Sequence, residues 1–336
     1  MTAFTSSGTE NQMAWDRRSR PFMEVWYATV THRRLRSGLW LRYTISAPRG
    51  GEASCALWAF YFDPEGKRSF AGRNDYPVDV LGHVPGRDDG AVVRIGDAWM
   101  TETHLGGRVD AGGRSLAWSL DVDPADRCYQ HLPSWLRDRA AGRFSTVCSP
   151  NLDVPFSGTV ELDGQVVRFE DEPGCQSHRW GRRHSHSWAW AHCGSWDGGD
   201  DAVFEGLTAR AAPSLPALTF LYLRHRGEDL VFDGVRPVLR ARSRVEPPVW
   251  AFGASNDRWK IAGAARLRLD RAVQVRYADP DGGARHCANS EIADIAIEVY
   301  GRSGGAWLHA ASLTSSGAGH VELGRPEPFP ELPVAF

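Results

Sequence analysis

The chain of 336 residues carries 39 basic and 41 acidic side chains, which gives a formal net charge of -2 with histidine neutral. A near-neutral chain lacks the concentrated positive surface that nucleic acid binding requires, which argues against a nucleic acid partner. Hydrophobic residues make up 42% of the chain, enough for a sizeable core. Because no apolar stretch has the length of a membrane span or a signal peptide, we expect a cytoplasmic protein without stable membrane insertion.

The first half of the chain predicts one short strand after another. Residues 1–20 are polar, and we expect them to be disordered. From Pro21 onward, apolar runs rich in aromatic and β-branched residues alternate with turn residues, which is typical of strands. The expected strands are 22–30, 39–46, 55–62, 114–122, 154–161 and 165–170. Asp163-Gly164 separates the last two and indicates a hairpin turn, while 133–141 is the one expected helix.

The second half continues the same pattern. Its expected strands are 187–196, 202–210, 217–224, 229–232, 248–253, 265–269, 272–278, 292–300 and 306–313. Many antiparallel strands must close into barrels or stack into sandwiches to hide their edges, and this number suits two barrels better than one. We therefore predict an all-β chain that divides near residues 171–176.

The segment CQSHRWGRRHSHSWAWAHC, residues 175–193, concentrates histidine and tryptophan. Side chains of a strand alternate between its two faces. Counted from residue 184, the large side chains share one face: His184, His186, Trp188, Trp190 and His192. The residues between them are serine, alanine or cysteine, so the other face is small throughout.

Three interpretations of this histidine-rich segment stay open. The H-x-H spacing of His184 and His186 places two imidazoles within reach of one metal ion, but no carboxylate follows a few residues later as a cupin-type site would require. An imidazole can also transfer protons near neutral pH. The third interpretation is a packed core without chemistry. The six scattered cysteines contain no C-x-x-C pair, which gives a zinc ribbon no support.

Several motifs resemble one family. CQSHRWG (175–181) followed by WAWAHC (188–193) resembles the D-H-x-W-G … W-x-W pattern of AttH and carotenoid hydratase-like proteins. That group includes hydroxyneurosporene synthase and lipocalin-like Diels–Alderases, with tocopherol cyclase as a distant relative. EVWYATVTH (24–32) and GLWLRYTISAP (38–48) resemble its opening, and CANSEIADIAIEVY (287–300) and GHVELGRPEP (319–328) resemble the closing segments of one branch.

This resemblance implies two lipocalin-like antiparallel β-barrels packed side by side, here residues 21–172 and 173–336. It also implies apolar polyene or prenyl ligands and water addition, proton-driven ring closure or cycloaddition, with no redox cofactor. By position, His178 and Trp180 match D-H-x-W-G, and the next two tryptophans match W-x-W. Ser177 stands where the pattern has an acidic residue, so a carboxylate that could orient the histidine is absent from its usual place.

The predicted site residues combine the resemblance with the strand patterns. Glu24 and Glu205 lie inside apolar strand segments, and burial raises the pKa of a carboxyl so that it can donate a proton to an alkene. An ion pair of Glu24 with a strand arginine such as Arg42 is the structural alternative. The predicted catalytic residues are His178, Glu24, Glu205 and His192. The predicted substrate-binding residues are Trp180, Trp188, Trp190, Trp58, Tyr27 and Tyr43.

We therefore expect a cyclase, isomerase or hydratase without a cofactor, acting on a small apolar polyene, terpenoid or polyketide-like substrate in an aromatic-lined pocket. Such a protein works by acid–base catalysis or by holding the substrate in a reactive shape. Two alternatives stay open: a non-catalytic protein that binds a lipid or pigment, and a metal-dependent enzyme that uses His184 and His186. The sequence leaves the substrate and the oligomeric state open.

Overall fold

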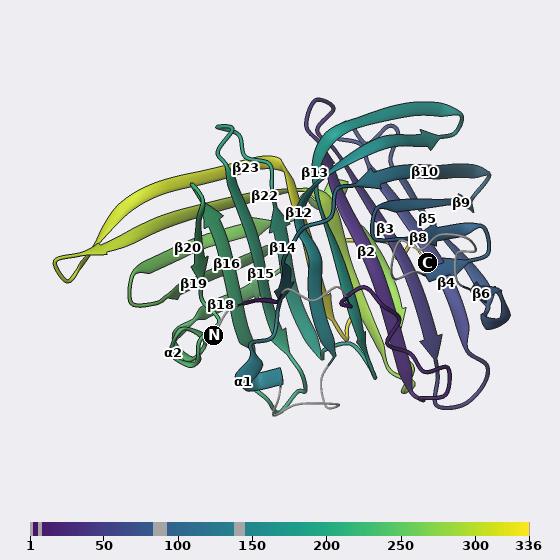
Figure 1. The fold of residues 1–336 in the computed structure, drawn as a ribbon, viewed down its shortest axis with the longest axis horizontal. Coiled ribbons are helices and arrows are strands. Elements are labelled where there is room, and N and C mark those ends of the chain that lie inside the picture. Colours follow the sequence, from purple (N-terminus) through teal and green to yellow (C-terminus); the bar gives the residue numbers. More distant parts are fainter. Residues whose placement is uncertain (1–2, 6–8, 83–92, 138–144, 336) are drawn as a thin grey trace.

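The computed structural model describes residues 3–5, 9–82, 93–137 and 145–335, and nearly all of their regular structure is β. The strands form two antiparallel sheets that lie side by side (Figure 1). The first sheet takes its strands from Phe4 to Gly181 and the second from Ser187 to Arg325. The prediction of an all-β chain is therefore confirmed.

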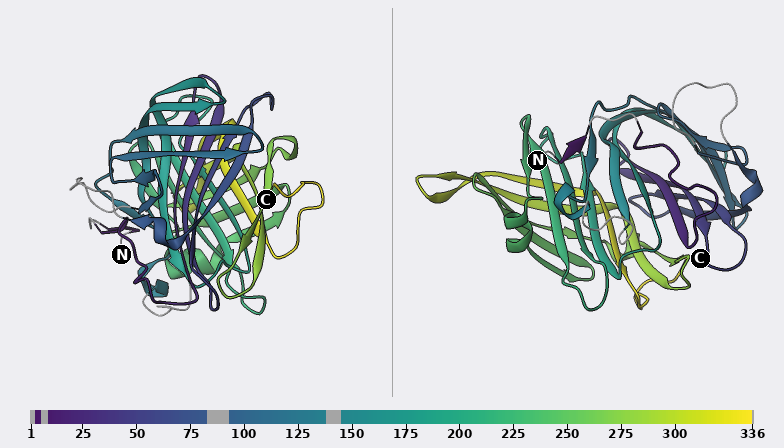
Figure 2. Two further views of the ribbon diagram at one scale, coloured as in Figure 1. Left: turned by 90° about the vertical axis from the view of Figure 1, so that its right-hand side faces the viewer. Right: turned by 60° about the horizontal axis from the view of Figure 1, so that its bottom comes forward.

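The first sheet curls into a near-closed barrel (Figure 2). Its main strands are β2 (Phe22–His32), β3 (Ser37–Ala47), β4 (Ser54–Phe62), β5 (Phe70–Pro77), β9 (His104–Ala111), β10 (Arg114–Val122), β12 (Thr146–Leu162) and β13 (Gln165–Gly181). They pair in the order β5-β4-β3-β2-β13-β12-β10-β9. The amide of Asn74 in β5 joins the two ends, because it donates to the carbonyl of Asp110 in β9 at 2.8 Å and accepts from its N–H at 3.0 Å.

Short elements complete this first half. They are β1 (Phe4–Thr5), η1 (Val78–Val80), β6 (Leu81–Gly82), β7 (Val93–Ile95), β8 (Ala98–Met100), β11 (Cys128–Gln130) and α1 (Ser134–Arg137). The helix expected at 133–141 thus begins as predicted, and its last residues lie outside the described part of the chain.

The second sheet pairs in the order β17-β16-β15-β14-β23-β22-β20-β19-β18. Its strands are β14 (Ser187–Cys193), β15 (Ala202–Arg210), β16 (Leu218–His225), β17 (Glu228–Val231), β18 (Arg242–Glu246), β19 (Val249–Ser255), β20 (Trp259–Arg266), β22 (Ala284–Ser303) and β23 (Ala306–Arg325). Strand β21 (Val273–Ala278) pairs with β22, and its Gln274 also forms a parallel bridge with Val334; η2 (Leu269–Arg271) precedes it. Helix α2 (Val235–Arg240) contacts β16 and β19, so it lies between the two ends of this sheet.

Alternation decides which side chains face the neighbouring sheet. In β3, Leu39, Leu41 and Tyr43 point into the first barrel, where they join its apolar core. Trp40 points the other way and packs in a separate cluster with residues of β21 and β22 from the second sheet. The outer side of the first sheet is therefore buried as well, which places a second apolar layer between the sheets.

The hairpin at Asp163-Gly164 is confirmed, with φ angles of 51° and 82° at the two residues. Its strands are longer than expected, because β12 and β13 each run for 17 residues with bulges that let them bend. The expected division at 172/173 falls inside β13, whose residues 174–181 pair with β2 of the first sheet. The chain changes sheets only in the connection 182–186.

Parts of the first twenty residues, which were expected to be disordered, pack on the first barrel. Phe4 and Thr5 pair with β11, and Asn11 and Trp15 are buried. Trp26 donates its indole N–H to the carbonyl of Asn11 at 2.9 Å. None of the described helices is long and apolar enough to cross a membrane.

Candidate functional site

A cavity of about 550 Å³ lies between the facing sides of the two sheets. Its volume is typical of sites for small molecules, and most of its lining is aliphatic or aromatic. The first sheet contributes residues of β2, β3, β12 and β13, and the second contributes residues of β14, β15, β16, β21 and β23. The cavity is therefore a product of the contact between the sheets rather than the inside of either barrel.

The outward positions of the first sheet supply one wall. Tyr27, Arg42 and Arg179 line the cavity, and they sit on three adjacent strands in the order β3-β2-β13. Tyr27 is the cross-strand neighbour of Arg42. Because the next residue of a strand points to the opposite face, His178 lies behind this wall rather than in it.

Strand β14 supplies the opposite wall, as its alternation predicted. Trp188 and Trp190 line the cavity, while Ala189 and Ala191 belong to the core of the second sheet. The strand begins only at Ser187, so His184 and His186 precede it and do not follow its alternation.

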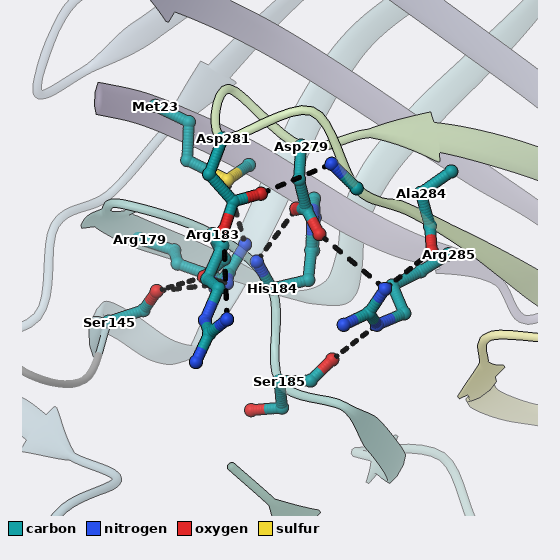
Figure 3. Close-up of polar contacts among 11 residues, drawn as sticks. Met23, Ser145, Arg179, Arg183, His184, Ser185, Asp279, Asp281, Ala284 and Arg285 are labelled. Carbon is teal, nitrogen blue, oxygen red and sulfur yellow. Dashed lines mark hydrogen bonds and ion pairs between the residues drawn. The ribbon is translucent and has the colours of Figure 1, made fainter. Parts of the chain in front are cut away.

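His184 nevertheless reaches the cavity from the connection between the sheets (Figure 3). Its backbone N–H donates to Asp279 at 2.8 Å, and its Nδ1 lies 2.6 Å from the same carboxylate oxygen. The ring stacks on Tyr277 with centroids 4.9 Å apart. Burial, with help from the nearby Arg179, lowers the pKa of His184 to about 3, so this imidazole is neutral at physiological pH.

Glu322 of β23 is the carboxyl group of the cavity lining. It is the cross-strand neighbour of Trp190. Its oxygens accept hydrogen bonds from Trp188 Nε1 at 3.4 Å and Asn289 Nδ2 at 3.2 Å. Burial raises the pKa of Glu322, and Arg42 together with these donors offsets the effect only in part. Glu322 therefore keeps its proton to a higher pH than an exposed glutamate, at a site that faces apolar space.

A second carboxyl, Glu205 of β15, lies on the other side of β14. It accepts from the indole N–H of Trp190, lies 3.0 Å from His192 Nδ1 and lies 3.4 Å from His131 Nε2. His131 lines the cavity, and burial lowers its pKa although Glu205 acts in the opposite direction. His131 is therefore a neutral imidazole, and the carboxyl of Glu205 contacts its Nε2.

Ser177 takes part in this second group of residues. Its hydroxyl lies 2.7 Å from that of Ser149, which in turn lies 3.0 Å from His131 Nε2. Residue 177 thus faces the second sheet, not His178. An acidic residue there would be directed toward His131, a function that Glu205 fills in this chain.

His178 and Glu24, two of the predicted catalytic residues, pair with each other inside the first barrel. Nε2 of His178 lies 2.9 Å from Oε1 of Glu24, and both side chains have no exposed surface. Glu24 also accepts the N–H groups of Ala14 and Trp15, and Nδ1 of His178 donates to the carbonyl of Glu10. These contacts fasten the N-terminal segment to the barrel, and neither residue lines the cavity. The alternative pair with Arg42 does not form, because Arg42 faces the second sheet.

The other predicted residues divide between the two layers. Tyr43 donates to backbone carbonyls and accepts the indole N–H of Trp118 inside the first barrel. Trp180 packs beside His178 with ring centroids 4.6 Å apart. Trp58 lies between the sheets, 5.7 Å from the ring of Tyr277. Of the predicted substrate-binding residues, Tyr27, Trp188 and Trp190 line the cavity.

Sequence reasoning missed several cavity residues: Glu322, His131, Arg42 as a lining residue, Arg179 and Tyr277. Glu322 did carry a signal, since it sits between Val321 and Leu323 in the same way that Glu24 sits between apolar neighbours. His131 carried none, because it follows a strand of only three residues.

Two further buried groups lie between the sheets. His320 bonds Glu291 and also lies 3.0 Å from the hydroxyl of Thr31 in the first sheet. Cys175, His192 and Glu205 lie close enough to hold a metal ion, with ligand atoms within 4.8 Å of one another. Burial raises the pKa of the Cys175 thiol well above its usual value, which disfavours the thiolate that a metal would need. All six cysteines are buried.

Comparisons with known proteins agree with this architecture. A tocopherol cyclase-like family model matches residues 147–325. Two uncharacterized proteins of Mycobacterium tuberculosis, from strains CDC 1551 and H37Rv, are each 30% identical over 325 residues, which cover 90% of this chain and 86% of theirs.

Two solved structures share the fold. One is a candidate AttH protein of Nitrosomonas europaea, with a TM-score of 0.54, 13% identity, and coverage of 90% of this chain and 91% of the other. The second is kievitone hydratase of Nectria haematococca, with a TM-score of 0.51, 10% identity, and coverage of 95% and 94%.

Proposed function

The chain belongs to the tocopherol cyclase-like family, and from this premise we propose that it is a cyclase or hydratase that protonates a carbon–carbon double bond. The substrate is a largely apolar polyene or prenylated molecule bound between the two sheets. The observation that carries the proposal is Glu322, a carboxyl with a raised pKa in a cavity of mostly apolar side chains. A buried carboxylic acid can serve as a proton donor at neutral pH.

The first chemical step is proton transfer from Glu322. Its O–H bond breaks, the proton forms a C–H bond with one alkene carbon, and positive charge develops on the other carbon. The rings of Trp188, Trp190 and Tyr277 line the same cavity, and aromatic faces stabilise a cation by electrostatic attraction. Because most of the lining is apolar, this attraction is stronger than it would be at the surface.

The second step is attack by an oxygen nucleophile. If water attacks, the product is an alcohol and the reaction is hydration; if a hydroxyl of the substrate attacks, a ring closes. In both cases the nucleophile loses one proton, and His131 accepts it. A carboxylate only accepts hydrogen bonds, so the tautomer with hydrogen on Nε2 satisfies Glu205 and leaves Nδ1 of His131 as the base.

The kievitone hydratase fold supports this reading, and so does the placement of the two groups. Glu322 on β23 is the cross-strand neighbour of Trp190, and Glu205 on β15, at the other side of β14, accepts the indole N–H of Trp190. The acid Glu322 and the carboxyl that supports the base His131 therefore both neighbour one tryptophan. Proton return from the base to Glu322 between turnovers completes the cycle.

The test is incubation with a panel of prenylated phenols and polyenes, followed by mass spectrometry. A gain of one water indicates hydration, and a new isomer of unchanged mass indicates cyclisation. Glu322→Gln keeps the shape of the side chain but removes the acidic proton, so turnover falls by about 100-fold while binding, read from tryptophan fluorescence, changes little.

The matched control is Glu298→Gln, an exposed residue of the β22–β23 hairpin that bonds Ser312 and His309. It should retain full turnover. Unchanged turnover in Glu322→Gln would contradict the assigned acid. Tight binding without any product from the unmodified protein would instead indicate a lipid or pigment carrier.

A further inference from the structure

The cavity contains more positive charge than an apolar ligand needs. Arg42 and Arg179 both line it, and their strands β3 and β13 flank β2 on its two sides. Strands two positions apart in a sheet are about 10 Å apart. Arg42 pairs with Tyr27 and Arg179 with Val25, two residues further along β2, so the two backbones start roughly 12 Å apart on the same face. Two long side chains at this separation can still reach a single ligand group.

Arg42 lies among aromatic rings. Its guanidinium carbon lies 4.3 Å from the ring centre of Tyr277 and 5.2 Å from that of Trp58. Its Nε donates to the hydroxyl of Thr44 at 3.0 Å. Within the residues that the structure describes, no carboxylate lies close enough to Arg42 to form an ion pair, although the side chain is buried. Such a cation is costly to bury without a counter-ion.

Among the described residues, the hydrogen-bond partners of Arg179 are neutral as well. It donates to the hydroxyl of Ser145 at 3.0 Å and to the carbonyl of Arg183 at 2.9 Å, and its contact with Met23 Sδ at 3.7 Å is weak (Figure 3). Burial, followed by repulsion from Arg42, lowers the pKa of Arg179 to about 10. Both arginines are therefore charged at neutral pH, and the repulsion between them makes the charged form of each less favourable.

The acidic groups nearby do not neutralise the two arginines. Asp279 holds His184 and lies 3.9 Å from Arg285, a third cation (Figure 3). The raised pKa of Glu322 favours its neutral form, and His184 is neutral too. The charges that face this part of the cavity therefore leave an excess of positive charge.

We propose that the ligand of this cavity is amphipathic, with an anionic head group, a carboxylate or phosphate, held between Arg42 and Arg179 and an apolar chain against the tryptophans of β14. The guanidinium fork matches the two oxygens of such a group, and burial strengthens the pairing. This inference deepens the proposed function and rests on it: it narrows the substrate class from hydrocarbons and neutral prenyl compounds to acidic ones.

The head group also affects the proposed acid. Arg42 opposes the rise in the pKa of Glu322. An anion paired with Arg42 cancels that influence, so Glu322 keeps its proton more firmly once the acidic ligand is bound. Ligand binding thus prepares the proton donor.

The test compares matched probes that differ only in charge. The polyene cis-parinaric acid and its methyl ester report binding by their own fluorescence, and farnesyl phosphate and farnesol, added as competitors, form the phosphate pair. In the unmodified protein at neutral pH, at least one anionic member binds about tenfold more tightly than its neutral partner, as expected for charge-assisted hydrogen bonds. Which pair shows the larger ratio tells carboxylate from phosphate.

Variants then locate the preference. Arg42→Met and Arg179→Met each reduce the preference for the anion to about twofold or less and leave the neutral probe unchanged. Arg244→Met, an exposed residue of β18 paired with Glu246, is the control and keeps the full preference. If Arg42→Met does not fold, the comparison in the unmodified protein and Arg179→Met still decide the matter.

Equal affinity for the charged and neutral members of both pairs would overturn the anion site and leave the proposed cavity and acid in place. No binding of any probe would overturn both, because the cavity would then not be the ligand site. Trp188→Ala should weaken charged and neutral probes alike, which tests the cavity separately from its charge.

Discussion

Two of the histidine–glutamate groups of this protein contain the same residue types but serve different purposes. His178 and Glu24 point into the first barrel, where backbone groups occupy their remaining positions and no surface is exposed. His131 and Glu205 lie on the other side of the same wall, and His131 faces a cavity. The first pair holds a segment in place, and the second can act on a ligand. The residue types alone therefore do not tell a structural pair from one that can act on a ligand; contact with the cavity does.

Breaking the pair of His178 and Glu24 inside the first barrel should give the largest effect on stability. Glu24→Ala leaves His178 and the N–H groups of Ala14 and Trp15 without their acceptor in a buried place, and we expect a loss of about 3–5 kcal/mol in the free energy of unfolding. Urea titration followed by circular dichroism measures it. Glu322→Gln should cost far less. A Glu24→Ala protein of normal stability but without turnover would reverse the two roles.

The contact between the sheets gives the next largest effect. A Cβ at Gly38 would lie 2.3 Å from Cβ of Glu291, so Gly38→Ala forces the two sheets apart. We expect a loss of about 1–3 kcal/mol, read as a lower melting temperature, together with weaker ligand binding in the cavity. Gly50→Ala, where nothing lies within 4 Å, is the control. A Gly38→Ala protein as stable as the control would show that this contact is loose.

A smaller change sharpens the role of Glu205. Trp190→Phe keeps an aromatic ring in the cavity but removes the indole donor to Glu205. We expect a loss of about 1 kcal/mol in stability and a change in kcat larger than that in KM, because the altered carboxyl supports His131 less well. Steady-state kinetics across a pH range measures both. The interpretation fails if KM alone changes.

The smallest effect concerns the pH dependence of Glu322. Its pKa in the folded protein is raised above the ordinary value of 4.5, so between the two values the folded state binds more protons than the unfolded state. The unmodified protein therefore loses stability relative to Glu322→Gln as pH rises through this window, by about 1 kcal/mol per pH unit. Below pH 4.5 the difference should be constant. A difference that stays flat at higher pH would mean that Glu322 ionises freely.

The sequence predicted which side chains share a face of a strand better than it predicted what that face packs against. Alternation placed Trp188 and Trp190 on one face of β14, opposite alanines, and the structure agrees. Alternation also implies that residues 177 and 178 point to opposite sides, so the expected partnership between a residue at 177 and His178 was wrong for any strand. Glu24 and His178 lie on adjacent strands, but only the register of β2 with β13 brings them together.

The cavity itself could not be read from any one segment. Arg42 and Glu322 are 280 positions apart in the chain, and both reach it because two whole sheets meet there. The sequence placed the division of the chain near residues 171–176, yet β13 continues through this stretch, with φ of 51° at Asp171. Such a local composition fits a turn between domains and a bulge within a strand equally well. Here the pairing of β13 with β2 makes the stretch part of one strand.

The first barrel is filled by its own side chains and by the N-terminal segment that Glu24 holds, so it forms a well-packed wall on one side of the cavity. The shape of the ligand space can then change through Leu207, Leu218 and Phe220 of the second sheet, which line the cavity from the opposite side. Substitutions there alter neither Glu24 nor the core behind it. A protein built in this way can acquire new substrates by altering one wall while the other keeps the fold intact.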